Sequence, residues 1–256
     1  MNNCEPVEMS VDELPQGGRP ASYPLLAATP KFSEMYPGVS VRFVRLRLGR
    51  STSALDLAEQ WEELHRDWCG TGRSAIAQTP EIAAYRAFYR QIGLNVDRTP
   101  PSTQGLIQRY LAGEIVRPLP PLPAVVNLVN IVAVRTLVPL GAFDCGALAG
   151  DVRLDVAVEG ERITPIGASS PIGIPAGAVV LRDDDKILSQ FGYRDAHAQR
   201  ITDDTKELML LACQVPGISD RLIWRSLDEA IAGLAQAFEA VPRQRVKAAN
   251  LDSNLG

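Results

Sequence analysis

The stretch PAVVNLVNIVAVRTLVPLGAFD, Pro123 to Asp144, decides the fold that we expect for this chain. Four of its apolar residues follow the i, i+3, i+4, i+7 spacing of a helix with one buried face: Val125, Leu128, Val129 and Val132. The spacing predicts a buried helix over residues 125–134, with a strand as the alternative because many of the residues are β-branched. After Pro139, the short run LGAFD indicates a strand.

Outward from this stretch, helices are predicted upstream and mainly strands downstream. Capping residues and apolar spacing predict helices over Ser53–Cys69, over Pro80–Ile92, and from Ser102 or Thr103 to Gly113. A strand with one basic face is expected over Val39–Gly49, and a long helix that begins near Ser219 is expected to reach Val241. We therefore expect an α+β fold in which helices pack on a mixed or antiparallel sheet and a long helix follows near the C-terminus.

Two shorter features complete this outline. Asp183–Lys186, DDDK, lies between two apolar runs and is predicted to be a hairpin tip. Residues 1–38 hold six prolines without apolar periodicity and are expected to be a loose or surface-draped arm. Residues 39–241 are expected to form a single domain and residues 242–256 a flexible tail.

Composition narrows the class of protein. No stretch resembles a secretion signal or a membrane span, so we expect a cytoplasmic protein without membrane contact. Four widely separated cysteines without a CxxC pair indicate reduced thiols rather than disulfides or a metal site.

The net negative charge of the chain argues against strong non-specific binding of nucleic acid. The chain has a net charge of -4, yet residues 41–120 carry 11 basic and 8 acidic side chains, a net charge of +3. Residues 121–240 carry 10 basic and 16 acidic side chains, a net charge of -6. This asymmetry is either chance or a sign that the first half faces RNA.

Classical catalytic motifs are missing from the sequence. The two histidines, His65 and His197, belong to no catalytic arrangement, and no glycine-rich phosphate loop occurs, so we expect no nucleotide cofactor. Polar residues in apolar surroundings remain as candidates: Ser102, Thr103, Gln104, Asn127, Asn130, Asp144 and Asp195. Asn127 and Asn130 share one side of the predicted helix, where they could serve a ligand or tie down the neighbouring proline-rich loop.

The order of three segments resembles a known family. VVNLVNIVAVRTLVPLGAFD, DVRLDVAVEGE and FGYRDAHAQRITDDTKELMLL are similar, in this order, to the B3/B4 domain of the phenylalanyl-tRNA synthetase β subunit. YRAFYRQIGLNVDRTPPSTQGLIQRYLAGE looks like the helical part of free-standing members. The resemblance implies an editing fold that hydrolyses mischarged aminoacyl-tRNA in trans, including tRNA that bears an arginine analogue such as canavanine. Its partner would be tRNA, and its oligomeric state stays open.

A departure from the family pattern concerns the side-chain pocket. The synthetase domain selects tyrosine through a threonine, a histidine and a glutamate, and the resemblance places Val129, Gly141 and Leu211 at these positions. Because a phenol hydroxyl would then lack partners, we expect tyrosine to be a poor substrate. A guanidinium-like side chain could instead pair with Asp195 or Asp144.

The resemblance also implies hydrolysis without a nucleophilic residue, since an aminoacyl ester is already activated and positioning supplies much of the rate. We expect backbone amides around Gly192 and the side chains of Ser102, Thr103 and Asn130 to place the ester and water. Gln104 would lie beside them and Asn127 would steady the segment, and the chain offers no better general base than Asp195 or a group of the substrate. The alternative is a binding module that has lost catalysis and holds tRNA or a free amino acid.

Overall fold

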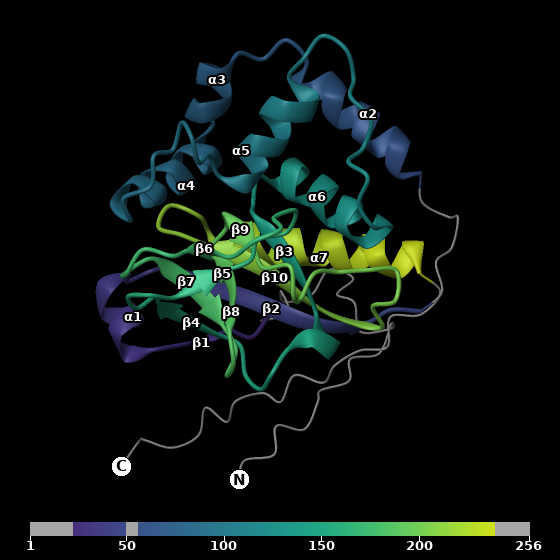
Figure 1. Cartoon of the computed structure of the whole chain (residues 1–256). Coiled ribbons are helices and arrows are strands. Elements are labelled where there is room, and N and C mark those ends of the chain that lie inside the picture. Colours follow the sequence, from purple (N-terminus) through teal and green to yellow (C-terminus); the bar gives the residue numbers. More distant parts are fainter. Residues whose placement is uncertain (1–22, 50–55, 239–256) are drawn as a thin grey trace, which may run out of the picture.

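The computed structural model describes residues 23–49 and 56–238 of the chain. Helices α2 to α6 lie in the upper half of Figure 1, above the strands, and α7, the longest helix, runs below α6 at the level of the strands. The helices are α1 Pro30–Met35, α2 Leu57–Trp68, α3 Arg73–Gln78, α4 Pro80–Gln91, α5 Ser102–Leu106, the π-helix Ile107–Leu111, α6 Ala124–Thr136, the 3-10 turn Cys145–Ala147 and α7 Asp220–Ala237.

The strands form three sheets. Their order is β2-β10-β3 in one sheet, β1-β4-β7-β8-β9 in the second and β5-β6 in the third. The bounds are β1 Ala27–Ala28, β2 Ser40–Arg47, β3 Leu140–Asp144, β4 Arg153–Val156, β5 Arg162–Ile163, β6 Ile172–Gly173, β7 Val179–Arg182, β8 Ile187–Gln190, β9 Arg194–Asp195 and β10 Glu207–Gln214. The expected α+β class, with helices packed on sheet and a long helix near the C-terminal end, is confirmed.

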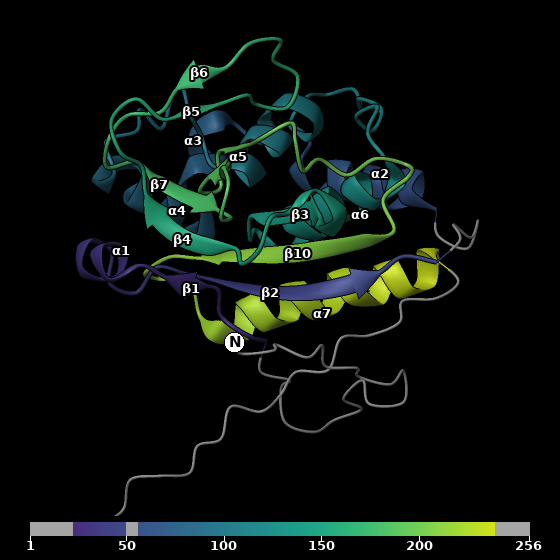
Figure 2. The same ribbon diagram turned by 60° about the horizontal axis from the view of Figure 1, so that its bottom comes forward.

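Strand β10 lies at the centre of the three-stranded sheet. It pairs antiparallel with β2 and with β3, and residues 208–213 are all buried. In Figure 2, α7 follows the line of β2 and β10. Helices α6 and α7 pack against each other, and a Cβ added at Gly233 would lie 3.2 Å from Leu128 Cδ1, so this glycine permits their close approach.

The predicted helix of the deciding stretch is present and longer than expected. α6 runs from Ala124 to Thr136, and nine of its residues are buried, which is why its sequence is almost uniformly apolar. The helix ends at Leu137 in the left-handed conformation (φ 58°), and Pro139 follows before β3 begins. The helix interpretation was right and the strand alternative was wrong.

Several local predictions need correction. Helix α2 begins after Asp56, whose carboxylate accepts hydrogen bonds from the N–H groups of Ala58 and Glu59; the expected cap, Ser53, lies outside the described residues. Neither Ser102 nor Thr103 caps α5, because Pro101 is the N-cap and no side chain satisfies the first turn. The short helix α3 was not predicted.

The expected loose arm is wrong for residues 23–38. Tyr23, Leu26 and Phe32 are buried, and α1 packs beside β4. Thr29 fastens this segment by capping α1 and by donating to the Asp155 carboxylate at 2.9 Å. The remainder of the expected arm, the tail over residues 242–256 and the end of the long helix at Val241 fall outside the described residues, and the domain division stays a prediction.

The DDDK turn is a hairpin tip, as predicted. Asp183 joins β7 to β8 and is 1% exposed. Burial raises the pKa of Asp183, but hydrogen bonds outweigh this effect and lower the pKa below the usual range. The largest of these contributions comes from the Lys186 ammonium, which donates to the carboxylate at 2.8 Å, and the others come from the N–H groups of Ala149, Lys186 and Asp185. In the described part of the chain, no helix is both long and apolar enough to cross a membrane.

Candidate functional site

Three adjoining cavities lie between α5, α6, β3, β9 and β10. The first has a volume of about 140 Å³, the second about 690 Å³ and the third about 400 Å³. Asn130 and Asp195 line all three of them. We refer to these as the inner, wide and side cavities, and their meeting point is the candidate site.

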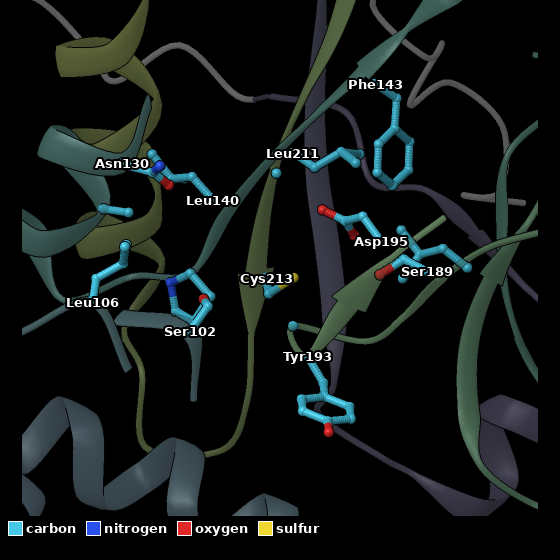
Figure 3. Close-up of a pocket in the computed structure, with 15 residues that line it drawn as sticks. Ser102, Leu106, Asn130, Leu140, Phe143, Ser189, Tyr193, Asp195, Leu211 and Cys213 are labelled. Atoms are coloured by element: carbon cyan, nitrogen blue, oxygen red, sulfur yellow. The ribbon is translucent and has the colours of Figure 1, made fainter. Parts of the chain in front are cut away.

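Figure 3 shows how the two shared residues face each other. Asn130 from α6 and Asp195 from β9 lie on opposite sides of the inner cavity, with Leu211 and Cys213 of β10 between them. Ser102, at the start of α5, lines the inner and the wide cavities. The structure thus brings together residues from four elements that are far apart in the sequence.

Asp195 carries a poorly compensated negative charge. Its side chain is half-buried, and among the described residues its carboxylate forms no ion pair with a lysine or arginine. Burial raises the pKa of Asp195 above its usual value, and a hydrogen bond with Ser189, its neighbour across β8 and β9, lowers it part of the way back. A carboxylate held this way favours a bound cation or a proton.

The turn that leads into β9 is fixed by a close contact. Gly192 has a positive φ of 61°, and a Cβ at this position would lie 2.7 Å from the hydroxyl of Tyr89. That hydroxyl donates to the carbonyl oxygen of Phe191 at 3.2 Å, so α4 holds the turn in place. Only glycine meets both the backbone angle and the space.

One backbone donor beside Gly192 is already engaged, because the Tyr193 N–H donates to the carbonyl oxygen of Gln190 at 2.8 Å. Gly192 lines the inner cavity and shapes it, and the expected role of its amide in placing the ester stays a prediction.

Cys213 lines the inner cavity, and sequence reasoning did not select it. Burial, with a smaller contribution from Asp195, raises the pKa of its thiol to about 12. The group is therefore protonated near neutral pH and lacks the thiolate that a nucleophile needs. Ser189, Leu106 and Tyr193 are further lining residues that the sequence did not single out, because they follow the ordinary pattern of a strand, a helix and a turn.

Four predicted site residues point elsewhere. Thr103 and Gln104 are 0% and 2% exposed, and Gln104 accepts a hydrogen bond from the buried Arg86 at 3.1 Å. Asn127 donates to the carbonyl oxygens of Pro120 and Leu122 at 3.0 and 3.1 Å, so it ties down the proline-rich loop, as its alternative interpretation held.

Asp144 is the fourth of them. Its carboxylate accepts hydrogen bonds from the Gly146 N–H and the Thr205 hydroxyl, both at 2.8 Å. These contacts hold the 3-10 turn and the loop before β10, and none of the three cavities includes Asp144. Its predicted pairing with a substrate cation therefore falls to Asp195 alone.

The three positions of the side-chain pocket do lie at the site. Gly141 and Leu211 are opposite each other on β3 and β10 and line the inner cavity, while Val129 lines the side cavity. The absence of a side chain at Gly141 leaves Leu211 as its nearest neighbour, 3.7 Å from where a Cβ would lie. Their apolar character leaves Ser102, Asn130, Ser189, Tyr193 and Asp195 as the polar side chains that line the inner cavity, besides the thiol of Cys213.

The described residues hold no group of three or more His, Cys, Asp or Glu side chains placed to bind a metal ion. Neither His65 nor His197 lines the three cavities.

Comparison with known proteins finds one matching family model and several relatives. Residues 84–227 match the family model described as B3/4 domain. The chain is 25% identical over 133 residues to the phenylalanine–tRNA ligase β subunit of Pseudomonas savastanoi pv. phaseolicola, covering 51% of this chain and 16% of that protein. For the corresponding subunit of Shewanella oneidensis the identity is 29% over 86 residues, covering 34% and 11%. The chain thus spans less than a fifth of the length of these relatives.

Among solved structures, an N-terminal fragment of the phenylalanyl-tRNA synthetase β subunit from Pyrococcus horikoshii matches with a TM-score of 0.42. The sequence identity is 15%, and the match covers 85% of this chain and 51% of that fragment.

The contact between Gly192 and Tyr89 generates a prediction. Gly192→Ala is expected to lower the free energy of unfolding by about 1–3 kcal/mol, because the new side chain meets both an unfavourable φ and the Tyr89 hydroxyl. Adding Tyr89→Phe to Gly192→Ala removes the obstructing oxygen and should recover part of the loss in urea unfolding. If Tyr89→Phe costs the same in both backgrounds, the close contact is not the cause.

The raised pKa of Asp195 generates a second prediction. A carboxyl whose pKa is higher in the folded protein than in the unfolded chain stabilises the folded protein while it is protonated. The protein loses this stability as the pH rises through the folded pKa, because the folded state then gives up a proton that it binds tightly. Asp195→Asn should therefore be more stable than the parent protein at pH 7. The difference should shrink as the pH falls toward the unfolded value of 3.8.

Urea unfolding of both proteins across this pH range measures the effect. Asp151→Asn, at an exposed position, controls for the removal of one negative charge. A stability difference between Asp195→Asn and the parent that does not change with pH would contradict the assignment.

Proposed function

Since the chain belongs to the B3/4 domain family, we propose that it is a hydrolase that deacylates mischarged aminoacyl-tRNA in trans. The observation that carries the proposal is the meeting of the three cavities at Asn130 and Asp195, because an aminoacyl ester has three parts to place. The amino-acid side chain, the terminal nucleotide and the attacking water each need a space that opens on the ester carbon. The action in trans rests on the resemblance to free-standing members.

Positioning carries the chemistry in this proposal. The Asn130 amide donates a hydrogen bond to the ester carbonyl oxygen, where negative charge develops as water attacks. A hydroxyl of the terminal ribose orients the water, and the ester oxygen leaves as the other ribose hydroxyl. Ser102 lies at the boundary of the inner and wide cavities, where its hydroxyl can bond the ribose or the water.

Asp195 selects the substrate by charge. Its uncompensated carboxylate gains most from a cation, and a planar guanidinium offers it paired hydrogen bonds. Apolar residues at Val129, Gly141 and Leu211 leave few partners for a phenol hydroxyl. We therefore propose that the amino acid is not tyrosine but an arginine analogue such as canavanine, with Asp195 facing its guanidinium-like group.

A second candidate function is a module that binds tRNA or an amino acid without turnover. The engaged amide of Tyr193 and the protonated thiol of Cys213 favour it, because neither group can stabilise a tetrahedral intermediate or act as a nucleophile. Tight binding of mischarged tRNA without release of amino acid would support this function instead.

Deacylation of a panel of mischarged tRNAs tests the proposal. The parent protein should release an arginine analogue faster than tyrosine. Asn130→Ala should lower kcat/KM by about 100-fold through loss of the carbonyl hydrogen bond. Asp195→Asn should abolish the preference for the cationic side chain, and Asp151→Asn should leave the rates unchanged. Equal rates for the parent protein and both site variants would refute the site.

Acetylation of the substrate's α-amino group separates two uses of Asp195. If Asp195 binds the side chain, the N-acetylated ester of the arginine analogue should still be hydrolysed faster than N-acetylated tyrosyl ester. If acetylation removes the preference, the carboxylate binds the α-ammonium group, and the proposed side chain is wrong.

A further inference from the structure

Helix α4 holds three walls of the candidate site, although none of its own residues lines the inner, wide or side cavity. The Tyr85 hydroxyl donates to the carbonyl oxygen of Cys213 at 2.6 Å. The Tyr89 hydroxyl donates to the carbonyl oxygen of Phe191 at 3.2 Å, and a third side chain, that of Arg86, reaches α5. The helix is therefore bonded to β10, to the turn before β9 and to α5, and each of these segments carries residues that line the inner cavity.

Arg86 is a buried arginine whose guanidinium joins two separate segments. The residue is 7% exposed. Its Nη1 donates to the carbonyl oxygen of Val96 and to Oε1 of Gln104, both at 3.1 Å. Its Nη2 donates to the Asp97 carboxylate at 2.9 Å. One planar group thus fastens the loop after α4 and helix α5 to the same point of the core.

Both of the fastened segments form cavity walls. Gln104 lies two residues after Ser102, which lines the inner and the wide cavities. The loop continues from Asp97 to Arg98, which lines the wide cavity. Asn95 completes this loop, because its side-chain oxygen accepts hydrogen bonds from the N–H groups of Asp97 and Arg98 at 3.1 and 3.2 Å. A shift of either segment would therefore change the shape of the site.

Helix α5 is too short to hold its own position. It has five residues, its N-cap is Pro101, and no side chain caps its first turn. Its place is therefore set by contacts with its neighbours, among which α6 packs beside it. In Figure 3, Ser102 of α5 and Asn130 of α6 lie on the same side of the inner cavity, and Asp195 lies on the opposite side. The bond between Arg86 and Gln104 fastens α5 from the side of α4.

Stability alone does not account for a buried guanidinium at this position. The carboxylate that pairs with Arg86 belongs to Asp97, whose side chain is 84% exposed, and an exposed carboxylate compensates a buried charge only weakly. Apolar residues of similar volume often replace a buried ionic group without loss of stability. An apolar side chain cannot, however, supply directed hydrogen bonds to two segments at once.

We propose that Arg86 is a positioning residue, which sets the place of Ser102 relative to Asn130 from within the core. The inference rests on the proposed function, since Ser102 and Asn130 are the groups that place the ester and the water. Arg86 lines none of the three cavities, so it acts through Gln104 and α5 rather than on the substrate.

Replacement of both partners of the bond tests the inference. The pair variant, Arg86→Met with Gln104→Met, leaves neither side chain with an unpaired polar group, so its urea unfolding should resemble that of the parent protein. Its kcat for deacylation should fall about tenfold or more while KM changes less than about twofold, because a misplaced Ser102 weakens the transition state rather than the binding of substrate. Gln104→Met alone keeps Arg86 bonded to Val96 and Asp97, and it should show the same loss of kcat even if the pair variant does not fold.

A double-mutant cycle identifies the group through which Arg86 acts. In a Ser102→Ala background, the pair variant should lower kcat by about twofold or less, because the hydroxyl that it misplaces is then absent. The matched control is Arg90→Met, since this arginine is exposed on the same helix, and kcat and KM should equal those of the parent. The same loss of kcat with and without the Ser102 hydroxyl would contradict the inference.

Amide hydrogen exchange of α5 in the absence of substrate distinguishes a failure of this inference from a failure of the proposed function. Residues 102–106 should exchange about tenfold faster in the pair variant than in the parent, and at the parental rate in Arg90→Met. Unchanged exchange, or an unchanged kcat in an active deacylase, would overturn the inference. Faster exchange in the pair variant of a protein that deacylates no charged tRNA would refute the proposed function and leave the placement of α5 by Arg86 standing.

Discussion

The pairing of β10 on both of its edges is the constraint on which the rest of the structure depends. This strand is buried over six consecutive residues, and its partners β2 and β3 come from opposite sides of the helical segment of the chain. Because β3 follows directly on α6, the pairing of β3 also fixes where α6 lies and which way Asn130 faces. Leu211 and Cys213 of β10 then form the floor between Asn130 and Asp195. The floor of the candidate site is thus a part of the core and cannot move independently of it.

The candidate site has two parts of opposite charge. A half-buried carboxylate without a basic partner lies at the junction of the cavities, and three arginines that have no acidic partner among the described residues line the wide cavity: Arg98, Arg109 and Arg194. The half-buried carboxylate costs free energy of folding because no basic side chain compensates it, whereas the exposed arginines are solvated by water. The proposed substrate, with a cationic side chain and phosphates, carries charges that are complementary to both groups.

The elements with strong periodicity could be predicted from the sequence, and the contacts among side chains could not. α6, α7, β2 and the DDDK hairpin followed from apolar spacing, capping and turn residues. The loose arm expected over residues 1–38 was wrong for residues 23–38, because single aromatic residues such as Phe32 bury themselves without a periodic pattern. Proline content alone does not distinguish a loose arm from a packed irregular segment.

For the candidate site too, the residue types could be predicted from the sequence and their contacts could not. Asn130, Asp195 and Ser102 were selected because they are polar among apolar residues, but the same criterion also selected Thr103, Gln104, Asn127 and Asp144. Gln104, Asn127 and Asp144 make structural hydrogen bonds and Thr103 is fully buried, so that only the three-dimensional structure separates the two groups. For Asp144 a local signal existed, since an aspartate two residues before glycine commonly caps a turn. For the unpaired arginines no signal existed, because their lack of partners depends on residues far away in the sequence.

The most direct test of the central claim is the structure of the complex with a non-hydrolysable analogue in which an amide replaces the ester between adenosine and the arginine analogue. The account predicts the amide carbonyl within hydrogen-bond distance of Asn130, the guanidinium-like group on Asp195 and the adenosine in the wide cavity. An analogue bound away from the junction of the three cavities, or with its side chain directed away from Asp195, would contradict it.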